Sequence, residues 1–277
     1  MAEERAYIQV INLEYRYGDG TQALTGINLE VREGEFIAFI GQNGSGKTTL
    51  SKCLNGLFKP TSGDVIVDGL NSKTTPIVQM VKRVGYVFQN PDHQLFNNTC
   101  WDEIAYGPRN IQLPEQEVKA RVEEAAQVVG LPDVYFEEHP FFLSKGLRQR
   151  VAIASILALR PQMIIVDEPT TGQDARQSIE IMDFLRDLNE KSGHTIIIIT
   201  HDMPIVASYA QRVVVMGTGQ ILLDGLTRDV FSQPETLART FLEPPQITQL
   251  AQRCQHLGFD PGTLTVDEMM AQYQDLF

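Results

Sequence analysis

A glycine-rich segment in the first fifth of the chain constrains its fold more than any other feature. Residues 41–48 read GQNGSGKT, which matches the pattern G-x-x-x-x-G-K-T of a phosphate-binding loop. The segment follows an unbroken apolar run, 36–40, and precedes a helical stretch, 49–57. This order of strand, loop and helix predicts an α/β core in which a buried parallel strand leads into a nucleotide site.

The residue types in this loop suit the phosphates of a nucleotide. Glycines let backbone N–H groups curl around the β- and γ-phosphates, and the following helix presents its positive end to them. Lys47 is expected to reach the phosphates, and the Thr48 hydroxyl is expected to bind Mg²⁺. A chance glycine-rich turn is the alternative, and the full match in its context argues against it. The predicted nucleotide-binding residues are Gly41, Gln42, Asn43, Gly44, Ser45, Gly46, Lys47, Thr48 and Thr49.

A second element is acidic. Residues 163–166 read MIIV and are followed by Asp167 and Glu168, which predicts a buried strand that ends in two carboxylates. Asp167 is expected to hold Mg²⁺ through water, and Glu168 to act as the general base that polarises the attacking water. Solvated acids that end a strand are the alternative. The two motifs together still leave many families of nucleotide hydrolase open.

A third motif points to one family. Residues 143–154, LSKGLRQRVAIA, resemble the LSGGQ signature and the following helix of ABC ATPases. Gln89 stands where this family has its Q-loop glutamine, residues 172–174 match the D-loop, and His201 stands where the family has its switch histidine. Tyr17 stands where the family has an aromatic residue that stacks on adenine. The order and spacing of these motifs carry the resemblance.

The resemblance implies an α/β fold: a P-loop ABC nucleotide-binding domain with a RecA-like core, an antiparallel β subdomain and a helical subdomain. We expect this domain over residues 1–233, with the helical subdomain at about 98–158. Alternating apolar residues over 7–31, with a Gly-Asp-Gly turn at 18–20, predict a hairpin in the antiparallel part. The cofactors implied are ATP and Mg²⁺.

The resemblance also assigns roles across a pair of chains. Gln89 is expected to bind Mg²⁺ and support catalysis, and His201 to donate to the γ-phosphate and help orient the water. Ser144 and Gly146 of the signature are expected to serve the nucleotide bound by the opposite subunit, and Asp174 of the D-loop is expected to bind nucleotide. Because the chain holds one set of motifs, it needs a second ABC ATPase chain, as a homodimer or a heterodimer.

Two departures from the family pattern fall in the signature and in the D-loop. Lys145 and Leu147 stand where LSGGQ has Gly and Gln, and Gln173 stands where Leu is usual in the D-loop. Lys145 places a cation near the partner's phosphates, where it would either strengthen binding or obstruct close approach. The sequence leaves both effects open.

Two further segments narrow the resemblance. Residues 87–96, VFQNPDHQLF, and 103–110, EIAYGPRN, resemble the energy-coupling factor ATPases, which drive uptake of vitamins or transition metals. In that family this region faces the coupling helices of a transmembrane T component, which works with a substrate-binding S component. The resemblance implies a peripheral importer ATPase at the cytoplasmic face of the cell membrane. Periodicity alone indicates only a polar loop before an ordinary helix.

Residues 234–277 predict a small helical annex. Apolar residues form a stripe on the first helix, Gly258 ends it, and Thr265 with Glu268 forms a capping box for the second. Similar annexes in energy-coupling factor ATPases help hold two ATPases together, so the resemblance implies a role in dimerisation. Packing of the stripe against its own domain is the alternative.

Composition narrows the classes of function. The 23 Lys and Arg residues against 35 Asp and Glu give a net charge of -12, which disfavours nucleic acid as a partner. The three cysteines form no CxxC pair, so neither a disulfide framework nor a zinc site is indicated, and a reducing cytoplasm suits them. The longest aliphatic runs, 163–166 and 196–199, are too short to cross a bilayer. We expect no signal peptide and no membrane span.

Two other classes of function stay open. A soluble ABC ATPase that is not coupled to transport would usually bring tandem domains, a long coiled-coil insertion or a basic surface. A non-hydrolysing regulatory ABC partner is suggested by Lys145, whereas Glu168 and His201 argue against it.

Overall fold

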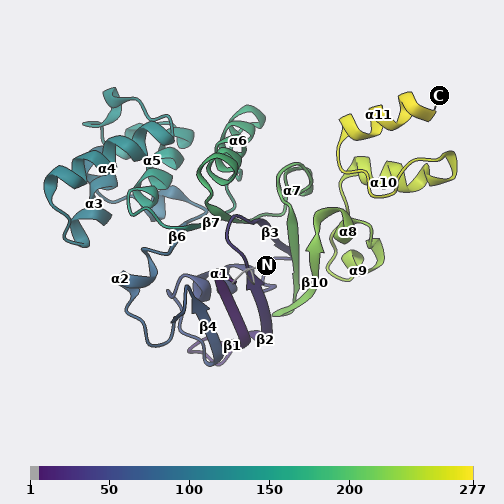
Figure 1. Cartoon of the computed structure of the whole chain (residues 1–277), viewed down its shortest axis with the longest axis horizontal. Helices are drawn as coiled ribbons and strands as arrows, with labels where there is room; N and C mark the ends of the chain where they lie inside the picture. Colours follow the sequence, from purple (N-terminus) through teal and green to yellow (C-terminus); the bar gives the residue numbers. More distant parts are fainter. Residues whose placement is uncertain (1–5, 277) are drawn as a thin grey trace, which may run out of the picture.

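A computed structural model of the protein describes residues 6–276, which form two sheets with helices around them (Figure 1). The larger sheet consists of β3 (Phe36–Gly41), β6 (Val84–Val87), β7 (Met163–Asp167), β8 (Thr195–Ile199), β9 (Arg212–Gly217) and β10 (Gln220–Leu226). Its order is β10-β9-β3-β8-β7-β6, and every neighbouring pair is parallel except β10 with β9. The predicted α/β core with a parallel strand at 36–40 is confirmed.

The central strands of this sheet are buried on both faces. Along β3, Phe36, Ala38 and Ile40 belong to one hydrophobic cluster, whereas Ile37 and Phe39 belong to a second cluster on the opposite face. Successive side chains of a strand point to opposite faces, so a strand covered on both sides is a continuous apolar run. Each large side chain buried in this way contributes about 1.5–3 kcal/mol to folding.

The second sheet is antiparallel and comes mainly from the start of the chain. Its strands are β1 (Ile8–Arg16), β2 (Gln22–Val31), β4 (Ser62–Val67) and β5 (Leu70–Asn71), in the order β2-β1-β4-β5. β1 pairs with β2 across the Gly-Asp-Gly turn, which confirms the predicted hairpin. Helix α1 (Lys47–Leu54) packs with both sheets, because Leu50 and Leu54 are fully buried in the cluster that the two sheets share.

A group of helices lies at one end of the molecule in Figure 1, beyond β6. Its helices are α3 (Cys100–Asn110), α4 (Glu115–Val128) and α5 (Lys145–Leu157), with 3-10 turns η1 (Pro91–His93), η2 (Asp133–Tyr135) and η3 (Pro140–Phe142). The short helix α2 (Ile77–Met80) comes before β6 and lies apart from this group in Figure 1. The Thr99 hydroxyl starts α3 by accepting from the Asp102 backbone N–H at 3.0 Å. Helices α3, α4 and α5 contact one another, as a helical subdomain requires.

The remaining helices follow the larger sheet. They are α6 (Ala175–Ser192), α7 (Met203–Tyr209), α8 (Thr227–Phe231), α9 (Pro234–Ala238), α10 (Gln246–Arg253) and α11 (Val266–Leu276), with a 3-10 turn η4 (Gln255–Leu257). Leu237 of α9 is fully buried in the main core, whereas α10 and α11 form the end of the molecule opposite α3–α5 (Figure 1). A domain boundary at residue 234 stays a prediction.

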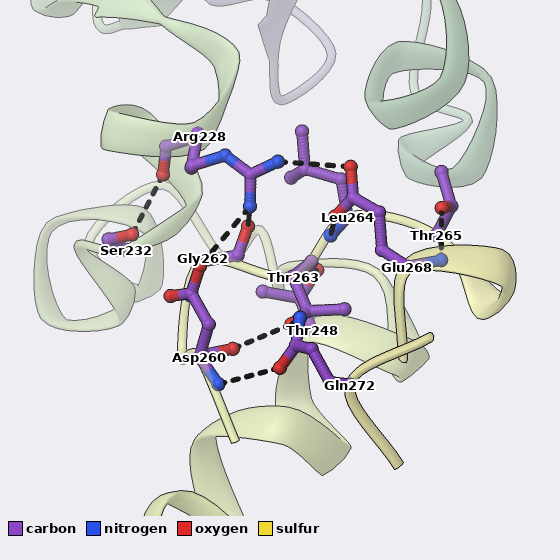
Figure 2. Close-up of polar contacts among 10 residues, drawn as sticks. All are labelled: Arg228, Ser232, Thr248, Asp260, Gly262, Thr263, Leu264, Thr265, Glu268 and Gln272. Atoms are coloured by element: carbon purple, nitrogen blue, oxygen red, sulfur yellow. Dashed lines mark hydrogen bonds and ion pairs between the residues drawn. The ribbon is translucent and has the colours of Figure 1, made fainter. Parts of the chain in front are cut away.

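Polar contacts fix the annex to α8, as Figure 2 shows. The Arg228 guanidinium donates to the Gly262 carbonyl oxygen at 2.6 Å and to Glu268 Oε1 at 2.9 Å. Glu268 also starts α11: its backbone N–H donates to the Thr265 hydroxyl at 3.2 Å, and its Oε2 accepts from the Leu264 backbone N–H at 2.8 Å. This is the predicted cap, with the reciprocal bond one residue earlier than in a standard capping box.

The length and hydropathy of the helices bear on membrane insertion. Over residues 6–276, none of them is both long and apolar enough to span a bilayer.

Candidate nucleotide site

The ends of four parallel strands bring the predicted motifs together. β3 runs into the glycine-rich loop, β7 into Asp167 and Glu168, β8 toward His201, and β6 toward Gln89. Because the strands are parallel, all four carboxyl ends lie at the same edge of the sheet. Ligands of open α/β sheets bind at this edge.

A pocket of about 430 Å³ opens at this edge. The predicted residues that line it are Tyr17, Asn43, Gly44, Gly46, Lys47, Thr48, Thr49, Gln89, Asp167 and Glu168. Thr21, Gln22, Ala23 and Ile199 also line it and were missed by sequence reasoning. Thr21, Gln22 and Ala23 follow the hairpin turn beside Tyr17, so the predicted hairpin could have indicated that they lie near the site. Ile199 is the last residue of a buried strand, and nothing in the sequence marks it as a pocket residue.

Close contacts with neighbouring strands explain two of the loop glycines. A Cβ on Gly41 would lie 2.3 Å from the Met216 carbonyl oxygen, and one on Gly46 would lie 2.8 Å from a Leu24 methyl carbon. Both glycines also have positive φ, at 148° and 103°. The loop can therefore pass this close to Met216 of β9 and Leu24 of β2 only without side chains at these positions.

Lys47 is buried and holds the loop closed. Its Nζ donates to the Gly41 carbonyl oxygen at 2.7 Å and to the Gln42 carbonyl oxygen at 2.9 Å. Burial lowers the pKa of the ammonium group, and the carboxylates of Glu168 and Asp167 oppose this by raising the pKa. The positive charge thus lies next to the carboxylates, inside the pocket that the loop encloses.

Asp167 is a buried carboxylate with oxygen partners. Its Oδ2 accepts from the Thr48 hydroxyl at 3.2 Å and from the Tyr86 hydroxyl at 2.8 Å. Burial raises the pKa of Asp167, while these two hydrogen bonds oppose the rise. Mg²⁺ prefers oxygen ligands, so the hydroxyl and carboxylate here, with the nearby Gln89, fit that ion.

Glu168 is held by several contacts in a strained backbone conformation. Its φ is 49°, a left-handed value that is strained for a residue with a side chain as long as glutamate. Its backbone N–H donates to the Ile199 carbonyl oxygen at 2.8 Å, which ties it to β8. Its Oε1 lies 2.9 Å from His201 Nδ1, and its Oε2 accepts from the Thr171 hydroxyl at 3.1 Å. The predicted base is therefore oriented through both carboxylate oxygens.

His201 and Tyr17 lie at the rim of this arrangement. The His201 side chain is 70% exposed, contacts Glu168 and does not line the pocket. Tyr17 lines the pocket, and its hydroxyl lies 2.8 Å from the Thr49 hydroxyl. The Tyr17 ring meets the Phe58 ring edge to face, with centroids 6.0 Å apart.

Ser144 and Gly146, expected to serve a partner's nucleotide, lie outside this pocket, and so does Asp174 of the D-loop. The Ser144 hydroxyl caps α5 by accepting from the Leu147 backbone N–H at 3.4 Å, and Asp174 caps α6. Gly146 lies in the first turn of α5, close to the Gln177 side chain. Lys145 is held on its own chain, since its Nζ donates to the Thr171 carbonyl oxygen at 2.8 Å.

A family model described as ABC transporter matches residues 24–171, more than half of the chain. The chain belongs to the ABC transporter family. The phosphate-binding loop, Gln89, Asp167 and Glu168 are the parts of the ABC pattern that the strand ends bring together in the pocket. The family and fold predicted from the sequence are confirmed.

Two curated relatives show where in the family this ABC chain falls. A putative ABC transporter ATP-binding protein of Caldanaerobacter subterraneus is 53% identical over 95% of the chain and 45% of the relative. The energy-coupling factor transporter ATP-binding protein EcfA2 of Clostridium perfringens is 43% identical over 91% of each. The chain spans about half the length of the first curated relatives that it matches. The resemblance to energy-coupling factor ATPases is confirmed by the relatives of similar length.

Two solved ABC structures resemble the chain. CbiO1 of Clostridium perfringens, described as part of the ABC transporter complex CbiONQ, superposes with a TM-score of 0.76 at 38% identity, covering 89% of this chain and 99% of CbiO1. The ATP-binding cassette MJ0796, a dimer bound to ADP and phosphate, superposes with a TM-score of 0.70 at 28% identity, covering 79% and 98%. The first matches this chain over almost its own whole length, and the second is a dimer of this fold in a post-hydrolysis state.

Proposed function

We propose that this ABC chain binds Mg-ATP, hydrolyses it in a pair with a second ABC chain, and couples the cycle to an energy-coupling factor importer. The importer would take up a vitamin or a transition-metal ion. The observation that carries the proposal is the placement of Glu168, oriented by His201 and Thr171, in the same pocket as the phosphate-binding loop.

The side chains of the pocket have distinct tasks in this proposal. Lys47 and the backbone N–H groups of the loop offset the charge of the γ-phosphate. Glu168 accepts the proton of the attacking water, and His201 donates to the γ-phosphate and helps orient that water. When bound, Mg²⁺ supplies positive charge next to the phosphate oxygens, with Thr48, Asp167 and Gln89 as its proposed ligands.

The proposed pair follows from the residues that lie outside the pocket. Ser144 and Gly146 lie at the start of α5, and the amino end of a helix favours anions. We assign these residues, with Asp174, to the nucleotide of the opposite chain, across an interface like that of the dimeric MJ0796. The partner is either a second copy or a related ABC chain.

An apolar groove supports a membrane partner. A hollow of about 320 Å³ lies between β6, α2 and α3, in the segment that resembles the energy-coupling factor ATPases. Phe96 and Tyr106 line it and are 61% and 45% exposed, with their rings edge to face at 4.8 Å. We assign the groove to a coupling helix of a transmembrane T component, which acts with a substrate-binding S component. In this proposal the chain acts at the cytoplasmic face of the membrane.

The annex offers a second apolar surface. Its large side chains on α10, η4 and α11 are 41% to 61% exposed: Leu250, Leu257, Val266, Met270, Tyr273 and Leu276. Packing against the chain's own domain therefore leaves much of this surface uncovered. We assign it to contact with the second ATPase.

Replacing the proposed base tests hydrolysis directly. In Glu168→Gln the side chain keeps its size but cannot accept the proton, so we expect turnover to fall about 10²–10⁴-fold while ATP stays bound. The measurement is phosphate release by the native complex, with the retained nucleotide counted after gel filtration. Glu190→Gln, on the exposed face of α6, is the matched control and should turn over at the parental rate. Parental turnover in Glu168→Gln would remove the assignment of the base.

A further inference from the structure

Lys145, which departs from the signature pattern, contacts the loop of its own chain that follows Glu168. Lys145 begins α5, directly after Ser144, and its Nζ donates to the Thr171 carbonyl oxygen at 2.8 Å. Thr171 lies in the loop that leads from β7 to α6, the D-loop region of this chain. The Lys145 ammonium group is therefore hydrogen-bonded to the loop that follows the proposed base, Glu168.

Gly172 makes room for this contact. A Cβ at this position would lie 2.2 Å from Lys145 Nζ, so any side chain here would displace the ammonium group. Gly172 also has a φ of 72°, in the region that favours glycine. The contact thus depends on a lysine in one motif and a glycine in the other.

Thr171 continues the connection to Glu168. Its hydroxyl donates to Glu168 Oε2 at 3.1 Å, and its backbone N–H donates to the Glu168 carbonyl oxygen at 3.2 Å. The other carboxylate oxygen, Oε1, lies 2.9 Å from His201 Nδ1. One residue therefore links the Lys145 ammonium to the Glu168 carboxylate.

We propose that Lys145 is a positioning residue that orients Glu168 through Thr171, an inference that rests on the proposed role of Glu168 as base. Lys145 holds the main chain of Thr171 in place, and this fixes the hydroxyl against Oε2. A base must be oriented to within a fraction of an ångström, so loss of this restraint slows the reaction without weakening ATP binding. Lys145 directly follows Ser144, which we assign to the partner's nucleotide. Its side chain therefore connects the surface that faces the partner with the base of its own chain.

Lys145→Met tests the link, because it keeps an unbranched side chain but removes the N–H donors. In the full-length protein in its native complex, we expect kcat to fall about tenfold with an unchanged KM for ATP. Thr171→Val should lower kcat to a similar extent. The double variant should be no slower than the slower single variant, because both changes break one path. Lys145→Arg, which keeps donors, should recover most of the rate.

The controls separate this inference from the proposed function. Lys119→Met, an exposed lysine on α4, should match the parental kcat, and melting temperatures confirm that each variant is folded. A raised KM with parental kcat in Lys145→Met would show that Lys145 acts on the partner's nucleotide. A double variant whose loss in kcat is the product of the two single losses would show that Lys145 and Thr171 act independently. Either result overturns the link. Parental turnover in Glu168→Gln would instead remove the base itself, whatever Lys145→Met shows.

Discussion

At the scale of single residues, the phosphate-binding loop is shaped by positions that cannot carry a side chain. Gly41 has a φ of 148°, and a Cβ there would lie 2.3 Å from the backbone carbonyl oxygen of Met216. This oxygen belongs to β9 and cannot rotate away as a side chain could. The physical reason that a loop position requires glycine therefore differs from one glycine to the next.

Two alanine substitutions compare these causes. Gly41→Ala should lower the free energy of unfolding by about 2–4 kcal/mol, because the clash adds to an unfavourable φ. Gly44→Ala should cost about 1–2 kcal/mol, since its φ is 79° but no atom lies within 4 Å of the added carbon. Urea unfolding of both variants beside the parental protein measures the difference. Equal losses would mean that the clash at Gly41 relaxes at no cost.

How far the sequence could predict the site differs among these residues. The loop and the Asp167–Glu168 pair were predictable because each follows an apolar strand, and such strands end at one edge of a parallel sheet. The contact made by the Lys145 side chain was not predictable, because its acceptor lies 26 residues away in a loop whose path depends on Gly172. The contact of His201 with Glu168 likewise depends on two strand ends at once.

At the scale of elements, apolar runs predicted the strands well, whereas helix surfaces were harder to interpret. β7 and β8 are buried on both faces, so their sequences leave few alternatives. The apolar stripe of α10 could equally have packed on its own domain, and only the fold shows Leu250 and Leu257 about half exposed. Sequence patterns indicate that a helix has an apolar face but not what covers it.

The turn between α6 and β8 carries a histidine whose burial predicts a dependence on pH. Burial lowers the pKa of His194 below its ordinary value of 6.5, while hydrogen bonds to the backbone of Pro161 and Gln162 oppose this. Below pH 6.5 the unfolded chain takes up a proton at this site more readily than the folded chain, so stability falls as the pH falls.

Replacing this side chain should weaken the pH dependence. We expect His194→Gln to lose less unfolding free energy than the parental protein between pH 7 and pH 5, as measured by urea unfolding. The exposed His256, in the annex, provides the control: His256→Gln should keep the parental slope. Parental slope in His194→Gln would show that this residue keeps an ordinary pKa in the fold.

At the scale of the whole molecule, three surfaces serve different proposed contacts. We propose that the nucleotide pocket and the start of α5 face a second ABC chain, that the groove beside α3 accepts a membrane component, and that the annex contacts the second ATPase. The helical subdomain and the annex form opposite ends of the molecule (Figure 1). This layout would let the membrane contact and the annex contact use parts of the chain that are separate from the nucleotide pocket.

The most direct test of the transporter account is to purify the tagged full-length chain from its native membranes in mild detergent. Mass spectrometry then identifies the proteins that come with it and their stoichiometry. Phe96→Asp, in the groove, is the matched variant: it should lose the membrane proteins and keep the second ATPase. We predict that the parental chain brings down a second ABC subunit, a polytopic T-like protein and a small substrate-binding membrane protein. Recovery of soluble chains alone, with ribosomes or DNA factors, would contradict the account and leave only the ABC domain.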